Sequence, residues 1–198
     1  AYLDTIHPNR NWRYHDHRDS SIQNYVIAVE ELVRRGYFAV RMGSVVKEKL
    51  VASNQFIIDY ASSRERTDFL DMYLGAKCRF FICSEAGIST LPEIFRRPVV
   101  YVNWSKILLI STWVLNGLFI CKKIYLINEK RLMTFSERMK IGFGGKDTSE
   151  IIAKLNLELI ENTPEEIKAV TIEMDERLNG TWKTTEEDVE FQQRFWAL

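Results

Sequence analysis

The 198-residue sequence contains only three cysteines and three histidines, and its 27 basic residues equal its 27 acidic residues in number. Cys78, Cys83 and Cys121 form no C-x-x-C pair, so we predict reduced thiols and no disulfide framework. The odd spacing of Cys78 and Cys83 predicts that they face opposite sides of one strand. All histidines lie within the first 17 residues, so His15 and His17 would need further ligands to bind a metal. We therefore predict no metal site, and the balanced charge argues against a nucleic-acid partner.

The sequence also lacks the common motifs of phosphate-binding enzymes. It has no complete G-x-G-x-x-G pattern and no P-loop. It has no D-x-D pair to hold a divalent ion against a diphosphate. The charge of any bound phosphate would therefore have to be balanced by donors of the protein itself.

No hydrophobic run is long enough to span a membrane. The mostly apolar stretch at 107–120 is too short and is interrupted by Asn116 and Gly117. We interpret it as part of the core or as a surface that contacts a partner. A peripheral contact with a membrane surface is a further alternative. The absence of a signal peptide predicts a cytoplasmic protein, and the absence of a start methionine predicts that the chain begins inside a longer protein.

The central pattern is a strand, a loop of small residues, a helix and a second strand. An apolar run at 79–83 predicts the first strand, and the loop that follows reads SEAG at 84–87. Ser89 and Thr90 are suited to cap the helix, and the apolar residues at 99–103 predict the second strand. Such a unit is typical of a parallel sheet.

The rest of the chain continues this alternation, which predicts an α/β fold with a Rossmann-like parallel sheet and helices on both faces. We expect a single domain over 1–198 with a helical tail from about 163. Helices are predicted at about 20–36, 67–76, 148–155, 163–180 and 185–196, and further strands at 38–42, 56–60, about 125–128 and 157–160.

Polar residues follow the predicted strands. Arg41 and Asp59 end the strands at 38–42 and 56–60, and the small-residue loop follows the next strand. The carboxyl edge of a parallel sheet and the amino end of a helix attract anions, so this edge predicts a phosphate site. From these residues alone, a tight turn without a ligand is an open alternative for the loop. A surface ion pair with a neighbouring acid is an alternative for Arg41, and a helix or loop cap is one for Asp59.

Three segments resemble a family of bacterial glycosyltransferases: 17–43, which begins HRDSSIQNY; 57–103, which contains CSEAGIST; and 158–198, which begins ELIENTPEE. The family is similar to the carboxyl-terminal half of GT-B glycosyltransferases and, distantly, to O-fucosyltransferases. The resemblance implies a nucleotide-sugar donor, a glycan or protein acceptor in surface polysaccharide or protein glycosylation, and a longer two-domain protein. It implies no further cofactor.

The resemblance also assigns residues to the donor site. The phosphates would be bound by Arg41, Ser84, Gly87, Ile88, Ser89 and Thr90. The nucleoside would lie near Asp59, Tyr60 and Asp68. The polar loop with His15, His17, Arg18 and Asp19 would lie at the active site.

Two other functions are open at this point. A sugar-nucleotide epimerase of similar architecture would bind the same donor but would need no acceptor. A non-catalytic interaction domain would bind neither and would use 107–120 as its partner surface. The residues alone identify no catalytic base, sugar, nucleotide or oligomeric state.

Overall fold

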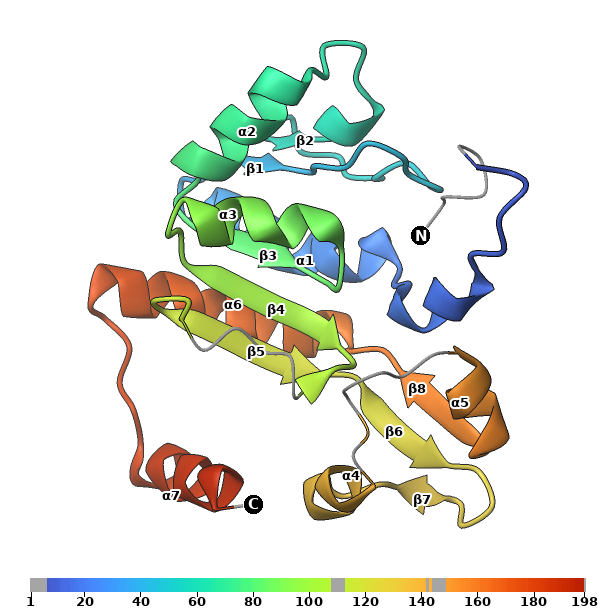
Figure 1. Cartoon of the computed structure of the whole chain (residues 1–198). Helices are drawn as coiled ribbons and strands as arrows, with labels where there is room; N and C mark the ends of the chain where they lie inside the picture. The colour runs from blue at the N-terminus through green and yellow to red at the C-terminus, as the bar shows by residue number, and fades with distance from the viewer. Residues whose placement is uncertain (1–6, 108–112, 142, 144–148, 198) are drawn as a thin grey trace.

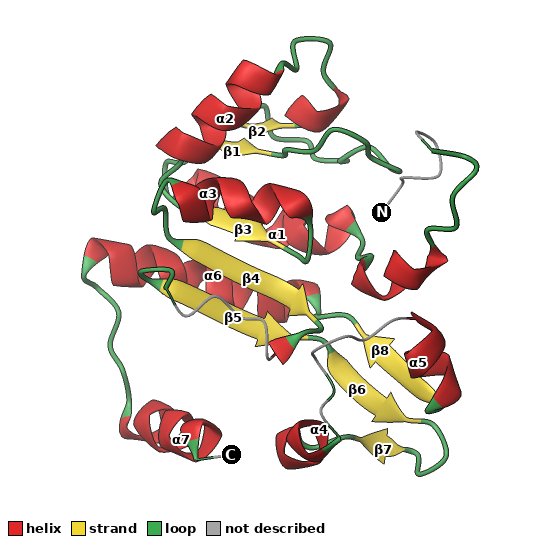
Figure 2. Cartoon of the chain, viewed as in Figure 1, coloured by secondary structure: helices red, strands yellow, loops and turns green. Residues whose placement is uncertain are grey.

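The computed structural model describes residues 7–107, 113–141, 143 and 149–197 (Figure 1). Helices alternate with short strands through most of this range (Figure 2). The helices are α1 (Val26–Arg34), α2 (Asp68–Lys77), α3 (Thr90–Ile94), α4 (Phe135–Lys140), α5 (Ser149–Lys154), α6 (Pro164–Asn179) and α7 (Glu186–Trp196). The strands are β1 (Ala39–Val40), β2 (Ile57–Ile58), β3 (Phe81–Cys83), β4 (Val99–Trp104), β5 (Gly117–Cys121), β6 (Lys123–Leu126), β7 (Arg131–Leu132) and β8 (Leu157–Ile160).

The strands form three small sheets. The first is the parallel pair β1-β2, and the second is the parallel sheet β3-β4-β5. The third, β7-β6-β8, is antiparallel. The fold is therefore mixed α/β, as predicted, but the expected single Rossmann-like sheet is not seen: within the described residues β1 and β3 are not hydrogen-bonded to each other.

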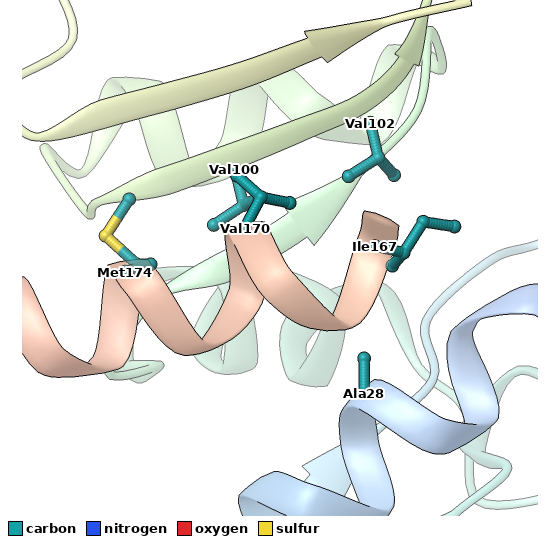
Figure 3. Close-up of a cluster of buried hydrophobic side chains, with 6 residues drawn as sticks. All are labelled: Ala28, Val100, Val102, Ile167, Val170 and Met174. Atoms are coloured by element: carbon teal, nitrogen blue, oxygen red, sulfur yellow. The ribbon is translucent and has the colours of Figure 1, made fainter. Parts of the chain in front are cut away.

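The main core lies between the sheet β3-β4-β5 and the helices α1 and α6. Val100 and Val102 of β4 meet Ile167, Val170 and Met174 of α6, and Ala28 of α1 completes the cluster (Figure 3). Helices α2 and α3 lie on the opposite side, in front of the strands in Figure 1. Because β4 is covered on both faces, its residues from 99 to 103 are all buried, which explains its continuous apolar run.

Helix caps explain where several elements begin. Thr163 and Glu166 form the predicted capping box of α6, and Thr67 accepts the amide hydrogen bond of Leu70 at the start of α2. The helix predicted from residue 20 starts differently. Ser21 caps a short 3₁₀ helix at 22–25, and α1 follows it.

Several predicted segments have other structures. Residues 117–120 of the apolar stretch, together with Cys121, form strand β5 against β4, while 108–112 lie outside the described residues. Cys78 caps the end of α2 and does not belong to β3, so the expectation that it shares a strand with Cys83 is wrong. Position 148, where a helix was expected to begin, is also outside the described residues.

A reciprocal pair of hydrogen bonds joins the end of β4 to the start of α6. The amide of Asn103 donates to Oδ1 of Asn162 at 2.6 Å, and the amide of Asn162 donates to Oδ1 of Asn103 at 2.7 Å. Both residues are buried, and Asn103 has a positive φ of 55°, which asparagine tolerates better than most residues. This clamp fixes the carboxyl end of the central strand.

The predicted helical tail divides into two different parts. Helix α6 is a core helix, whereas α7 makes its main contact through one aromatic side chain. Phe195 packs against Phe119 of β5 and Phe135 of α4, with ring centroids 5.8 and 5.5 Å apart. Trp196 beside it remains 71% exposed.

Candidate functional site

A cavity of about 460 Å³ separates the two parallel sheets. Residues 37–42 on the β1 side and 79–84 on the β3 side line it. Most of its walls are apolar, with Val29 and Leu32 from α1 and Leu74 from α2. Ser20, Arg41 and Ser84 contribute polar groups to the same cavity. A cleft with apolar walls and a few polar groups is the usual form of a ligand site.

Arg41 follows β1 and is held in place by two partners. Its Nη1 donates to the carbonyl oxygen of Glu48 at 2.7 Å and lies 3.3 Å from Oδ1 of Asp59. Asp59 also accepts the amide hydrogen bond of Leu50. Arg41 therefore pairs with a neighbouring acid, as the alternative predicted, but both side chains are largely buried and the pair is not at the surface. Among the described residues, the hydrogen bonds of this guanidinium all come from Nη1, so Nε and Nη2 are available to a ligand.

The small-residue loop after β3 folds into a 3₁₀ turn. Residues 87–89 form this turn, and α3 follows directly from Thr90. Ser89 and Thr90 were expected to cap the helix. Instead Ser89 is already in helical conformation and is buried, and the Thr90 hydroxyl donates to the carbonyl oxygen of Gly87 at 2.8 Å.

Glu85 anchors the loop to the end of β4. Its Oε1 accepts hydrogen bonds from the Ser105 amide, from the Ser105 hydroxyl at 2.7 Å and from the Lys106 amide at 2.9 Å. Glu85 is buried, and its Oε2 has no hydrogen-bond partner among the described residues. A buried carboxylate oxygen without a partner is costly, so a polar ligand or water would be stabilised there.

The predicted active-site loop comes to the same edge. Residues 13–18 form a 3₁₀ helix, and the buried ammonium of Lys122 donates to the carbonyl oxygens of His17 at 3.1 Å and Asp19 at 2.6 Å. Arg138, also buried, donates to the carbonyl oxygens of Ser105 and Lys122. These bonds join the loop to the ends of β4 and β5.

His17 and His15 differ in their surroundings. Burial lowers the pKa of His17, although the nearby Glu85 carboxylate raises it. Both ring nitrogens of His17 lack a hydrogen-bond partner among the described residues. Burial and the Arg18 charge lower the pKa of His15 to about 4, and its ring lies 3.8 Å from that of Tyr14. His17 and Glu85 are thus two buried polar side chains near enough to influence each other electrostatically.

The residues expected near the nucleoside are not gathered at the cavity. Tyr60 is buried, and its hydroxyl lies between the amide and the carbonyl of Thr67, which is a structural role. Asp68 is fully exposed at the start of α2. Of the three, only Asp59 contacts a residue that lines the cavity, namely Arg41.

The sequence analysis assigned no role to three charged residues of this edge, which are Glu85, Lys122 and Arg138. Glu85 stands in the predicted loop, but nothing in its spacing indicates burial. Lys122 follows a strand that was not predicted, and Arg138 lies in the unpredicted helix α4. Long-range packing alone brings these charges together.

The fold and the edge together define a mixed α/β protein with a polar cluster at the ends of its parallel strands. Comparison with protein-family models, with curated proteins and with solved structures gives no match. Among the described residues, no helix has the length and apolar character needed to cross a membrane, and no three His, Cys, Asp or Glu side chains gather as a metal site.

Proposed function

We propose that the chain is the donor-binding domain of a glycosyltransferase, which binds a nucleotide sugar and transfers the sugar to a glycan or protein acceptor. One observation carries the proposal: Arg41 and Ser84, which follow different strands, line the same cavity. Ligands of parallel α/β proteins bind in the crevice at the carboxyl ends of the strands. We read the sheets β1-β2 and β3-β4-β5 as two parts of one Rossmann-like arrangement around this crevice.

The chemistry would be displacement at the anomeric carbon of the donor, with a nucleoside diphosphate as leaving group. Charge that develops on this group is stabilised by hydrogen-bond donors that are already fixed before the reaction. Arg41 suits this role because Asp59 and Glu48 orient its guanidinium while Nε and Nη2 stay available. The hydroxyl of Ser84 is a second donor.

The polar loop supports the same function. A proton acceptor for the acceptor hydroxyl must be uncharged or negative at working pH. Burial lowers the pKa of His17, which favours its uncharged form, although Glu85 acts in the opposite direction. We propose His17 as the first position to mutate in a search for the catalytic base.

The test is calorimetry with a panel of nucleoside diphosphates and the matching nucleosides. We expect at least one diphosphate to bind and its nucleoside to bind much more weakly, because the phosphates meet Arg41. Thermal unfolding gives a second readout, since a ligand at 100 times its Kd adds about 2.7 kcal/mol of stability. Failure of every diphosphate to bind would refute the proposal.

The same samples separate the alternatives. An epimerase would convert a bound nucleotide sugar without any acceptor, which chromatography of the nucleotide sugar detects. An interaction domain would bind neither donor nor product. A glycosyltransferase would bind the donor and leave its sugar unchanged until an acceptor is added.

A further inference from the structure

One end of the cavity carries a cluster of uncharged hydroxyl groups. Ser20 precedes the 3₁₀ helix at 22–25, Tyr25 is the last residue of that helix, and Ser84 follows β3; all three line the cavity. The hydroxyl oxygens of Ser20 and Tyr25 lie 3.4 Å apart. A good hydrogen bond between hydroxyls is shorter, at about 2.7 to 2.8 Å. Both hydroxyls can therefore still bond to a ligand.

A buried amide group lies beside the Tyr25 hydroxyl. Asn103 at the end of β4 is fully buried, and its Nδ2 has no hydrogen-bond partner among the described residues. Burial raises the pKa of Tyr25, while the nearby side chains of Ser20, Asn103 and Ser84 lower it. The raised pKa keeps the hydroxyl protonated at neutral pH. Tyr25 can therefore accept a hydrogen bond from Asn103 and donate its own hydrogen to a ligand.

The hydroxyl cluster contains no charge. Among the described residues that line the cavity, Arg41, Lys77 and Arg79 are charged and none is acidic. Lys77 and Arg79 precede β3, whereas Ser84 follows it, so they lie toward the other end of the strand. A charged ligand group at the cluster would lose its water without gaining a counter-charge, which is costly. An uncharged group that is rich in hydroxyls would replace its bonds to water with bonds to the cluster.

Ser84 connects this cluster with the proposed phosphate site. In the proposed function the Ser84 hydroxyl donates to a phosphate, and the same side chain is near enough to Tyr25 to lower its pKa. The sugar of a nucleotide sugar is attached directly to the second phosphate. A sugar on that phosphate would therefore lie beside Tyr25 and Ser20.

We propose that Tyr25 and Ser20 bind hydroxyl groups of the donor sugar and select a sugar without charge, such as a neutral hexose. Tyr25 would be the main specificity-determining residue, because its ring packs against the main core and thereby fixes the hydroxyl. Asn103 would be a positioning residue that acts through Tyr25. The inference rests on the proposed function, since the sugar lies here only if its phosphates bind at Arg41 and Ser84.

The experiment is calorimetry with each nucleoside diphosphate and its nucleotide sugar, in the original chain and in variants. Tyr25→Phe should weaken binding of a neutral nucleotide sugar by about three- to tenfold, the usual effect of losing one hydrogen bond. It should leave the affinity for the diphosphate unchanged. Ser20→Ala should act in the same direction without any change in the core.

Tyr37→Phe is the matched control. Tyr37 also lines the cavity, but its hydroxyl donates to Asp175 at 2.6 Å. Its loss should therefore leave the affinities for nucleotide sugar and diphosphate in the same ratio. The charge of the sugar is tested with two matched pairs, UDP-glucose with UDP-glucuronate and GDP-mannose with GDP-mannuronate. In each pair that binds, the neutral sugar should bind more tightly.

The outcomes separate this inference from the proposed function. Failure of every diphosphate to bind would refute both. If a diphosphate binds, the inference alone is refuted when Tyr25→Phe and Ser20→Ala leave the nucleotide-sugar affinity unchanged, or lower it no more than that of the diphosphate. Equal or tighter binding of the charged sugars would refute the selection of an uncharged one. Retained diphosphate binding shows that a variant is folded, and Ser20→Ala decides if Tyr25→Phe does not fold.

Discussion

Arg41 and Asp59 are bound to each other, with Nη1 3.3 Å from Oδ1, although the resemblance to glycosyltransferases assigns them to different parts of a donor. Both side chains are largely shielded from water, with 10% and 19% of their surface exposed. The aspartate therefore positions the guanidinium and balances part of its charge. A ligand phosphate would have to share Arg41 with Asp59.

The first prediction concerns Arg41→Ala. The substitution should weaken nucleoside diphosphate binding by about 1.5 to 3 kcal/mol, the usual contribution of a hydrogen bond to a charged group. Binding of the nucleoside alone should change little. Calorimetry with both ligands measures the difference.

Arg64→Ala is the matched control, because Arg64 is exposed in the loop that leads to α2. It should leave both affinities unchanged. Equal losses for diphosphate and nucleoside in Arg41→Ala would mean that the residue supports the fold and does not contact phosphate.

A second prediction is that donor binding does not depend on a divalent metal. The sequence has no D-x-D pair, and Arg41 can supply charge at the cavity. The affinity measured by calorimetry should be the same with EDTA as with Mg²⁺. Loss of binding in EDTA and its recovery with Mg²⁺ or Mn²⁺ would contradict this assignment.

The third prediction tests the anchor made by Glu85. Glu85→Leu should lower the free energy of unfolding by about 3 kcal/mol, because it leaves the buried amide and hydroxyl donors around Ser105 without an acceptor. Glu85→Gln should cost much less, since its amide oxygen can still accept these bonds. Urea unfolding of both variants gives the comparison, and similar losses in the two would show that the hydrogen bonds are not the cause.

The fourth prediction concerns pH. The pKa of His15 in the folded chain is lowered to about 4, first by burial and then by the charge of Arg18, whereas an unfolded histidine has a pKa of about 6.5. Between these values the unfolded chain binds more protons, so the free energy of unfolding should fall as the pH drops from 6.5 toward 4. His17 acts in the same direction.

His15→Gln should therefore make this decrease shallower, as measured by urea unfolding at pH 7, 6 and 5. The exposed Gln192 does not titrate and provides the control, and Gln192→Asn should leave the slope as in the original chain. Carboxylates with lowered pKa, such as Glu137 at about 2, lose their contribution only at lower pH. An unchanged slope in His15→Gln would exclude His15 as the cause.

Local signals in the sequence predicted elements well where a cap or a buried strand was decisive. Thr163 and Thr67 begin α6 and α2 as expected, and the strand at 157–160 has the predicted bounds. The strand β5 was missed because its residues belong to one long apolar stretch. Pairing with β4, and not a local sequence pattern, decides which part of that stretch becomes a strand.

The candidate site was predictable only in part, for a physical reason. Arg41 and Ser84 could be predicted because each lies at the carboxyl end of a strand. The carboxyl ends of parallel strands lie at one edge of a sheet, whichever loops follow them. Burial of Glu85, Lys122 and Arg138 depends on contacts with residues up to 105 positions away, as between Lys122 and His17, and no spacing encodes it. Tyr60 and Asp68 were assigned by resemblance; in the fold Tyr60 bonds to Thr67, and the exposed Asp68 lies 3.9 Å from Arg66.

β1 and β3 are outer strands of their sheets, and each has one edge without a strand partner among the described residues. An unpaired strand edge is a template for pairing with another molecule, which natural proteins normally cover or interrupt with charge. Val40 and Ile82 present apolar, β-branched residues at these edges, with no charged residue between Phe80 and Cys83 on β3. The purified chain should therefore associate more as its concentration rises, and light scattering over a dilution series measures this association.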